Sequence, residues 1–214
     1  VVHTMMMFMM ELRQLIMNYK HFWNLLKTSM APKCKDGKFV YGEKTNLNAI
    51  KALCFFLSYD PRFVTELKLD PNKGLMFIGD TGTGKSIMIE SVSNNEYRPI
   101  KILNMKDIEA SVKETGVFDD FLFRRGWLLC IDDVGTEETP IDYFGTKINW
   151  FSDFIKKEDV KGRCDRVILT QNLNMEEVSA KYGARTASRI YQNFNIVVIK
   201  AEEDFRKKNR NVLK

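Results

Sequence analysis

The sequence predicts an α/β protein whose central parallel sheet is covered by helices on both faces. Five short apolar, β-prone runs follow one another along the chain, at residues 75–78, 100–104, 127–131, 167–170 and 196–200. Longer charged segments that are compatible with helices separate these runs. Continuous apolar strands that alternate with helices are typical of a sheet buried on both sides. A glycine-rich segment directly after the first run fits the same architecture.

The size and composition of the chain indicate one ordinary folded domain with a small appendage. The chain has 214 residues, of which 44% are apolar and 29% are charged; these fractions are usual for globular proteins. The net charge of +5 is compatible with binding to nucleic acid, but it is too small to establish such binding.

The cysteines and the first residues indicate a cytoplasmic protein without zinc or disulfides. The four cysteines are far apart, and none forms a C-x-x-C pair: Cys34, Cys54, Cys130 and Cys164. The apolar opening "VVHTMMMFMM" meets Glu11 and Arg13 too soon to span a bilayer. It also lacks the features of a secretion signal, so we expect either an amphipathic first helix or a leftover expression sequence, and no membrane association.

The N-terminal part is expected to be helical and to form a region of its own. Apolar residues between positions 5 and 30 recur at helical spacing, a stripe typical of a core or of a partner surface. A basic, turn-rich connection follows, and then residues 46–57 predict a buried helix capped by Asn46. We therefore divide the chain into a helical N-terminal region, 1–45, and a main domain, 46–214.

The segment "GDTGTGKS" matches the phosphate-binding pattern G-x-x-x-x-G-K-[ST] at every fixed position. It lies between a predicted strand and a predicted helix, where backbone N–H groups and the positive end of the helix dipole face an anion. Lys85 is placed to reach the β- and γ-phosphates, and the Ser86 hydroxyl to bind Mg²⁺. The predicted nucleotide-binding residues are Gly79, Asp80, Thr81, Gly82, Thr83, Gly84, Lys85 and Ser86.

A second motif, "WLLCIDDVG", is an apolar strand that ends in two acids. We expect Asp132 to hold Mg²⁺ through water, and Asp133 to orient or deprotonate the attacking water. Adjacent acids after a strand can also be plain solvated residues, but their place after the phosphate loop favours a metal-and-base pair. Aspartate is shorter than the glutamate often found at the second position, which favours slow hydrolysis. Glu137 and Glu138 follow closely and remain candidate helpers.

Polar residues after the fourth run supply a third signal, in "VILTQN". Thr170 and Asn172 are expected beside the acids, where an amide can position water against the γ-phosphate; an isolated Asn after a strand can equally be a turn residue. The run at 100–104 separates the loop strand from the acid strand in sequence, which suits additional-strand ATPases better than small nucleotide kinases.

Arginines near the end of the chain supply a fourth signal. Arg185 and Arg189 in "YGARTASRI" are four residues apart and so share a helix face. Such a pair can serve solubility alone, or one arginine can act as a finger on the γ-phosphate of a neighbouring subunit. Arg206, after the fifth run, is placed to act on the phosphates of its own chain.

In order and spacing these motifs resemble the DnaC/IstB-like ATPases, AAA+ proteins that include bacterial and phage replicative-helicase loaders and a transposition-helper branch. The resemblance covers residues 70–208, is most specific in "LTQNLNMEEVSAKYGARTASRI", and is closer to the loader branch. It implies a P-loop AAA+ core with a five-stranded parallel sheet and no C-terminal helical lid. The short segment after the last predicted strand agrees with that expectation.

The resemblance also implies roles for individual residues. Lys85 and Ser86 correspond to the phosphate-loop residues, and Asp132 and Asp133 to the metal and hydrolysis acids. Asn172 corresponds to the first sensor, and Arg206 corresponds to the second sensor. Arg189 corresponds to the trans-acting arginine, and Arg185 falls on a further arginine of the family motif. The resemblance further implies that residues 1–45 bind the partner and that residues 46–214 form the AAA+ ATP-binding domain. Residues 1–45 nevertheless match no loader motif, and no cysteine-rich zinc module precedes the core.

The segment between the second and third runs is where related initiators and loaders contact single-stranded DNA. Basic residues interleaved with phenylalanines suit phosphate contact and base stacking, although Phe118, Phe121 and Phe123 can equally be core residues. The candidate DNA contacts are Lys106, Lys113, Arg124 and Arg125.

The sequence as a whole predicts an ATP-binding, ATP-hydrolysing helicase loader that uses Mg²⁺. Its expected partners are a hexameric replicative helicase, single-stranded DNA and further copies of itself, with ATP sites at the subunit interfaces. Two alternatives remain open: a transposition helper that activates a transposase, and a nucleotide-gated adaptor that barely hydrolyses ATP.

Overall fold

The computed structural model describes residues 19–31, 46–117 and 127–200. Its main sheet has five strands that are all parallel and are ordered β2-β3-β6-β1-β7. The acid strand β3 and the loop strand β1 are therefore not neighbours, because β6 lies between them. The strands are β1 Gly74–Ile78, β2 Ile100–Asn104, β3 Leu128–Val134, β6 Val167–Gln171 and β7 Phe194–Val198.

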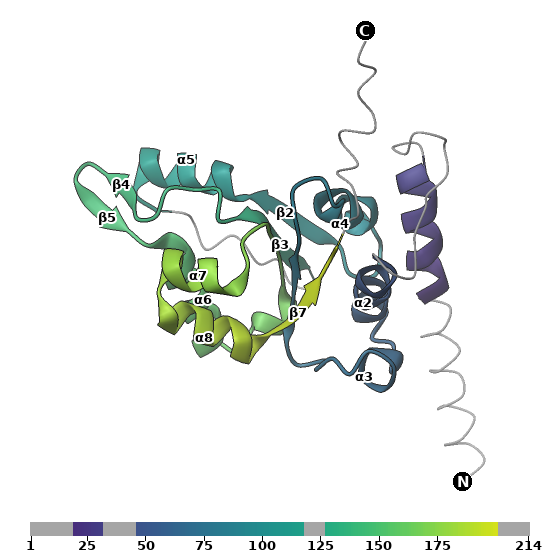
Figure 1. Cartoon of the computed structure of the whole chain (residues 1–214). Helices are drawn as coiled ribbons and strands as arrows, with labels where there is room; N and C mark the ends of the chain where they lie inside the picture. Colours follow the sequence, from purple (N-terminus) through teal and green to yellow (C-terminus); the bar gives the residue numbers. More distant parts are fainter. Residues whose placement is uncertain (1–18, 32–45, 118–126, 201–214) are drawn as a thin grey trace, which may run out of the picture.

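Helices cover both faces of this sheet (Figure 1). One face carries the helical residues 19–30 together with α2 Leu47–Ser58, α3 Arg62–Thr65 and α4 Lys85–Ser93. The other face carries α5 Met105–Thr115, α6 Trp150–Val160, α7 Met175–Tyr182 and α8 Ala184–Asn193. A short 3₁₀ turn, η2 Cys164–Arg166, precedes β6.

Strand alternation builds the two hydrophobic cores. In β1, Leu75 and Phe77 are fully buried against α2 and α4, whereas Met76 and Ile78 point to the side of α5–α8. Because successive side chains of a strand point to opposite faces, a continuous apolar run is what a sheet covered on both sides requires. The predicted α/β fold with a five-stranded parallel sheet flanked by helices is confirmed, and the phosphate-loop segment lies between β1 and α4 as expected.

The described part of the N-terminal region packs on the domain. Phe22 and Leu26 have no exposed surface, and they share a hydrophobic cluster with Phe55 of α2. The helix expected at 46–57 is present as α2, and Asn46 is its N-cap residue as predicted, although the Asn46 side chain makes no cap hydrogen bond. The division of function between residues 1–45 and 46–214 stays a prediction.

Several strand ends differ from the sequence expectation, and the differences are largest in β3 and β7. β3 extends past the expected residue 131 to Val134, and β7 begins at Phe194 rather than at 196. A β-hairpin that the sequence did not predict, β4 Ile141–Tyr143 and β5 Thr146–Ile148, follows β3. Each of its strands has three residues, too few for a readable alternation. Among the described residues, no helix combines the length and apolar character needed to cross a membrane.

Candidate functional site

Residues 79–84 connect the carboxyl end of β1 to α4, and Lys85 and Ser86 are the first residues of α4, so the loop residues 79–86 lie between strand and helix as predicted. The side chain of Lys85 folds back into this loop and is only 4% exposed. Its Nζ donates to the carbonyl oxygens of Gly79 (2.5 Å) and Asp80 (3.0 Å), and to the Oδ1 of Asn172 (2.8 Å). A nearly buried ammonium that lies within this loop is suited to bind an anion that enters the loop.

Glycine is required at two positions of the loop, for a different structural reason at each. Gly84 precedes α4 with φ +89°, a left-handed conformation that favours glycine. At Gly79 the reason is space, because an added Cβ would lie 2.4 Å from the carbonyl oxygen of Ile199, just beyond β7. The motif's first glycine therefore lets β7 pass close to the start of the loop.

Ser86 and Asp132 meet beneath the loop. The Ser86 Oγ donates to the Oδ1 of Asp132 at 3.0 Å, and the Asp132 carboxylate is 8% exposed. A hydroxyl and a carboxylate are oxygen ligands of the kind that Mg²⁺ binds together with nucleotide phosphates and water. In the described part of the chain, no three His, Cys, Asp or Glu side chains cluster as a metal site. The Ser86–Asp132 pair fits a Mg²⁺ that arrives with a nucleotide.

Asp133 lies in a β-bulge of the acid strand. Ile131 pairs with Leu169 and Val134 pairs with Gln171, so three steps along β3 match two steps along β6. Asp133 has φ +57°, a left-handed value that is uncommon for a residue other than glycine. Bulges and strained backbone often re-aim a side chain beside a functional site. Here the bulge adds one residue to β3, so Asp133 lies next to Asp132 outside the regular pairing and Val134 is again part of the hydrophobic core.

The hydroxyl of Thr170 connects the two acids. This fully buried residue of β6 donates from its Oγ1 to the Oδ1 of Asp132 at 2.5 Å, and it accepts the backbone N–H of Asp133 at 3.0 Å. The sequence placed Thr170 beside the acids but did not assign it to the site. The bond pattern needs the register of two strands that are far apart in sequence, so no local signal could have shown it.

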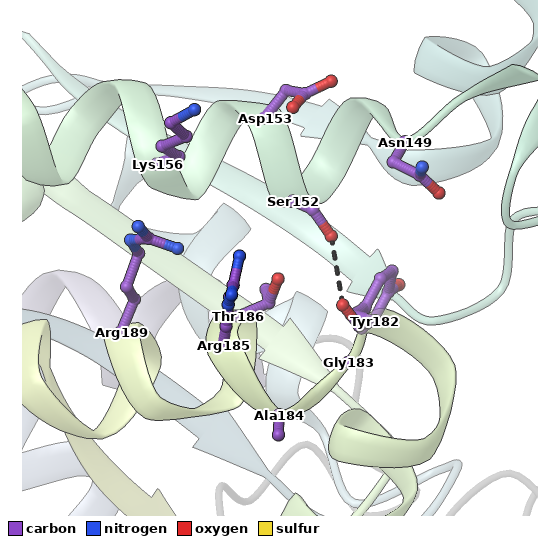
Figure 2. Close-up of a pocket in the computed structure, with 10 residues that line it drawn as sticks. All are labelled: Asn149, Ser152, Asp153, Lys156, Tyr182, Gly183, Ala184, Arg185, Thr186 and Arg189. Carbon is purple, nitrogen blue, oxygen red and sulfur yellow. Dashed lines mark hydrogen bonds between the residues drawn. The ribbon is translucent and has the colours of Figure 1, made fainter.

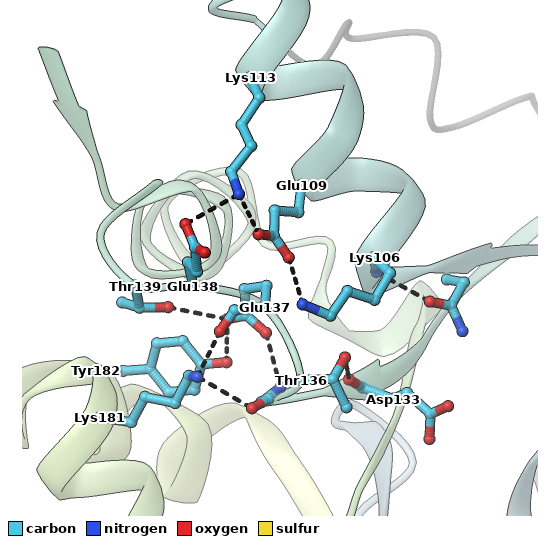
Figure 3. Close-up of polar contacts among 12 residues, drawn as sticks. Lys106, Glu109, Lys113, Asp133, Thr136, Glu137, Glu138, Thr139, Lys181 and Tyr182 are labelled. Carbon is cyan, nitrogen blue, oxygen red and sulfur yellow. Dashed lines mark hydrogen bonds and ion pairs between the residues drawn. The ribbon is translucent and has the colours of Figure 1, made fainter. Parts of the chain in front are cut away.

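Glu137 is bound into the loop after β3 (Figure 3). Only 3% exposed, it accepts the backbone N–H of Gly135 (2.9 Å), the hydroxyl of Thr139 (3.1 Å) and the hydroxyl of Tyr182. Lys181 donates to the carbonyl oxygens of Gly135 (3.0 Å) and Glu137 (2.6 Å). These bonds dock the loop on α7, which gives Glu137 a structural role in place of the helper role left open by the sequence.

Two of the four predicted DNA contacts lie on α5 and are paired with acids (Figure 3). Lys106 and Lys113 bind the two oxygens of Glu109 at 2.8 and 2.7 Å, and Lys113 also contacts Glu138 at 2.9 Å. Burial raises the pKa of Glu109, but the hydrogen bonds from both lysines outweigh it and lower that pKa overall. Arg124, Arg125 and the neighbouring phenylalanines lie outside the described residues, so DNA contact stays a prediction.

Arg185 and Arg189 line a groove between α6 and α8 with a volume of about 480 Å³ (Figure 2). Both side chains rise from α8 toward α6, where Lys156 adds a third cation. Arg189 forms an ion pair with Asp159 at 3.3 Å, whereas Arg185 is exposed. Neither arginine makes a hydrogen bond or an ion pair with loop residues 79–86, as far as the chain is described.

The predicted site residues thus fall into three groups. Lys85, Ser86, Asp132 and Asn172 are joined by hydrogen bonds at the carboxyl ends of β1, β3 and β6, and Asp133 lies next to them. Arg185 and Arg189 lie apart, on the α6–α8 layer. Arg206 lies outside the described residues.

The structure is similar to solved chains of DnaA and of ORC complexes. AMPPCP-bound DnaA from Aquifex aeolicus aligns with 20% identity and a TM-score of 0.49, over 78% of this chain and 50% of DnaA. A Drosophila ORC complex with poly(dA/dT) DNA and Cdc6 aligns with 11% identity and a TM-score of 0.39, over 90% of this chain and 32% of the matched chain. A second Drosophila ORC complex, with AT-rich DNA and Cdc6, gives 9% identity and a TM-score of 0.41 over 89% and 33% of the two chains.

This chain therefore spans half or less of each of these solved chains. No protein-family model matches the sequence, and no curated protein matches it significantly.

Proposed function

We propose that this chain is an ATPase of the DnaC/IstB-like AAA+ group that loads a replicative helicase. One observation carries the ATPase part of the proposal: the meeting of Lys85, Asn172, Ser86 and Asp132 at one edge of the sheet. Ligands of open parallel sheets bind at the carboxyl ends of the strands, and these side chains are of the types that phosphate and Mg²⁺ require.

In this proposal the loop residues bind and neutralise the triphosphate. The Lys85 ammonium, now held by carbonyl oxygens and by Asn172, turns to the phosphate oxygens. Ser86 and Asp132 would hold the Mg²⁺, which would neutralise the developing charge. Asp133 accepts the proton of the attacking water, and the freed Asn172 amide orients that water.

The position of the arginines supports a site shared between subunits. Arg185 and Arg189 line a groove on the layer opposite α4, away from the loop of their own chain. We assign Arg189 to the phosphate of a neighbouring subunit and Arg206 to the phosphates of its own chain. Binding of ATP would then hold the assembly together, and hydrolysis would release it.

The test of the ATPase starts with purified full chain, Mg²⁺ and ATP, with and without single-stranded DNA. Lys85→Ala should abolish binding of ATP, whereas the matched control Lys147→Ala should not, because Lys147 pairs with Asp142 in the β4–β5 hairpin. Turnover that is unchanged in Lys85→Ala would refute the proposed site.

The shared site is tested by mixing variants. In this proposal the Arg189→Ala variant and the Lys85→Ala variant each lack turnover. In a mixed oligomer, an Arg189→Ala subunit supplies an intact loop and a neighbouring Lys85→Ala subunit supplies an intact Arg189, so part of the turnover returns. No regain would refute the trans role of Arg189.

The loading function is tested by immobilising the full chain and offering a purified hexameric replicative helicase, with and without ATP. ATP-dependent capture supports the loading function. Capture of a transposase instead would assign the chain to the transposition branch, and binding of ATP without turnover would make it an adaptor.

A further inference from the structure

Thr170 lies at the centre of the site but is not among the residues assigned above. It sits in β6, between the loop strand and the acid strand, and has no exposed surface. A hydroxyl has one proton to donate and lone pairs to accept with. In Thr170 the proton goes to the Asp132 carboxylate, and a lone pair receives the Asp133 N–H. Both contacts fix the orientation of this hydroxyl.

The bulge explains why the backbone needs this hydroxyl. The extra residue in β3 takes Asp133 out of the regular ladder, and the N–H of Asp133 then donates to a side chain instead of a strand partner. A buried or half-buried N–H without a partner is costly, and so is a left-handed aspartate. The Thr170 hydroxyl accepts the Asp133 N–H, and by this hydrogen bond it also holds Asp133 in its left-handed conformation.

We propose that Thr170 is the positioning residue that holds Asp132 and Asp133 for hydrolysis, a role that rests on the proposed ATPase function. Its hydroxyl makes no hydrogen bond to loop residues 79–86 in the described chain. Removing the hydroxyl should therefore slow turnover without weakening the binding of ATP. Ser86 also donates to Asp132, so the loss should fall mainly on the placement of Asp133.

The test replaces Thr170 with valine, which keeps the shape of the side chain and removes the hydroxyl. Turnover at saturating ATP and Mg²⁺ should fall about 10- to 100-fold, the usual cost of losing a group that orients a site residue. Affinity for a fluorescent ATP analogue should stay within about twofold. Thr170→Ser keeps the hydroxyl and should restore most of the turnover.

Two comparisons separate this role from a merely structural one. Ser58→Ala removes a buried hydroxyl that donates to Cys54 in α2, and it should leave turnover unchanged. In an Asp133→Ala background, Thr170→Val should cause little further loss, because the residue through which it acts is already gone. If Thr170→Val does not fold, Thr170→Ala takes its place in both comparisons.

Three results would overturn the role of Thr170. The first is turnover of Thr170→Val close to wild type, and the second is turnover of Thr170→Ser as slow as that of Thr170→Val. The third is that Thr170→Val lowers turnover by the same factor in the Asp133→Ala background as in the wild type. Each of these requires an active wild type, so the proposed function would survive them. A wild-type chain that does not hydrolyse ATP would refute the ATPase itself, and the role of Thr170 with it.

Discussion

Replacing Tyr182 with phenylalanine probes the bond that docks the acid-strand loop on α7. The Tyr182 hydroxyl donates to Glu137, whose carboxylate is 3% exposed. Phenylalanine keeps the ring, which packs against Phe151 with centroids 4.7 Å apart. The substitution therefore removes one hydrogen bond to a buried acid and leaves the packing in place.

The cost follows from the remaining partners of Glu137. A hydrogen bond to a charged group contributes about 1.5–3 kcal/mol. The N–H of Gly135 and the hydroxyl of Thr139 still donate to the carboxylate, at 2.9 and 3.1 Å, so the acid is not left bare. We expect the free energy of unfolding to fall by about 2 kcal/mol, which corresponds to a Tm lower by roughly 4–8 °C for a chain of this size.

The pH dependence of stability should change as well. Burial, and then the charge of Glu137, raise the pKa of Tyr182 above its ordinary value. A folded pKa above the unfolded one contributes stability that is complete below a pH of about 10 and is lost as the pH rises above that value. Tyr182→Phe removes this contribution, so the variant should lose less stability than the wild type between neutral pH and strongly alkaline pH.

Urea unfolding measures both effects. Tyr143→Phe is the matched control, because the described residues offer no hydrogen bond to the Tyr143 hydroxyl, whose ring packs beside Gly116. It should change the free energy of unfolding by less than about 0.5 kcal/mol. Equal values for Tyr182→Phe and Tyr143→Phe would show that the Glu137 bond does not stabilise the fold.

Three other substitutions test the backbone. Phe144 has φ +46° at the hairpin tip and is 89% exposed; Phe144→Asn should raise the free energy of unfolding by about 1 kcal/mol, because asparagine tolerates this conformation and little packing is lost. A lower urea midpoint would contradict that reasoning. Gly74→Ala places a Cβ 2.4 Å from the carbonyl oxygen of Cys164, so it should lower stability by about 1–3 kcal/mol, measured by thermal melting. Asn174→Ala removes the capping box of α7 and should cost about 1 kcal/mol in the same melt, whereas an unchanged Tm would exclude a stabilising cap.

The sequence predicted the loop and the acids because their signals are local. A phosphate loop needs its glycines, Lys85 and Ser86 within one short segment, and the flanking apolar runs place that segment between a strand and a helix. The edge at which Asp132 and Asn172 meet also followed from the sequence, because parallel strands end on the same side. The five-stranded sheet was also predictable, because each of its strands is a local apolar run in the sequence.

The features that sequence reasoning missed depend on contacts between distant segments. The bulge at Asp133 exists only in the register of β3 against β6, and no pattern within β3 reveals it. Thr170 is an ordinary strand residue until that register brings its hydroxyl to the acids. The sequence leaves Glu137 open as a catalytic helper because its partner Tyr182 is 45 residues away along the chain.

The same contacts explain why the segment 170–190 reads as one motif. Its first residues position the acids and hold Lys85, its middle begins α7 with a capping box, and its next residues dock α7 on the loop after the acids. One residue with φ +87° then separates α7 from α8, so the docking of α7 also fixes where the arginine helix begins. The segment therefore connects the acids, through the docking of α7, to the place where the arginine helix starts. In chain order its bonded residues are Thr170, Asn172, Asn174, Glu177, Lys181 and Tyr182.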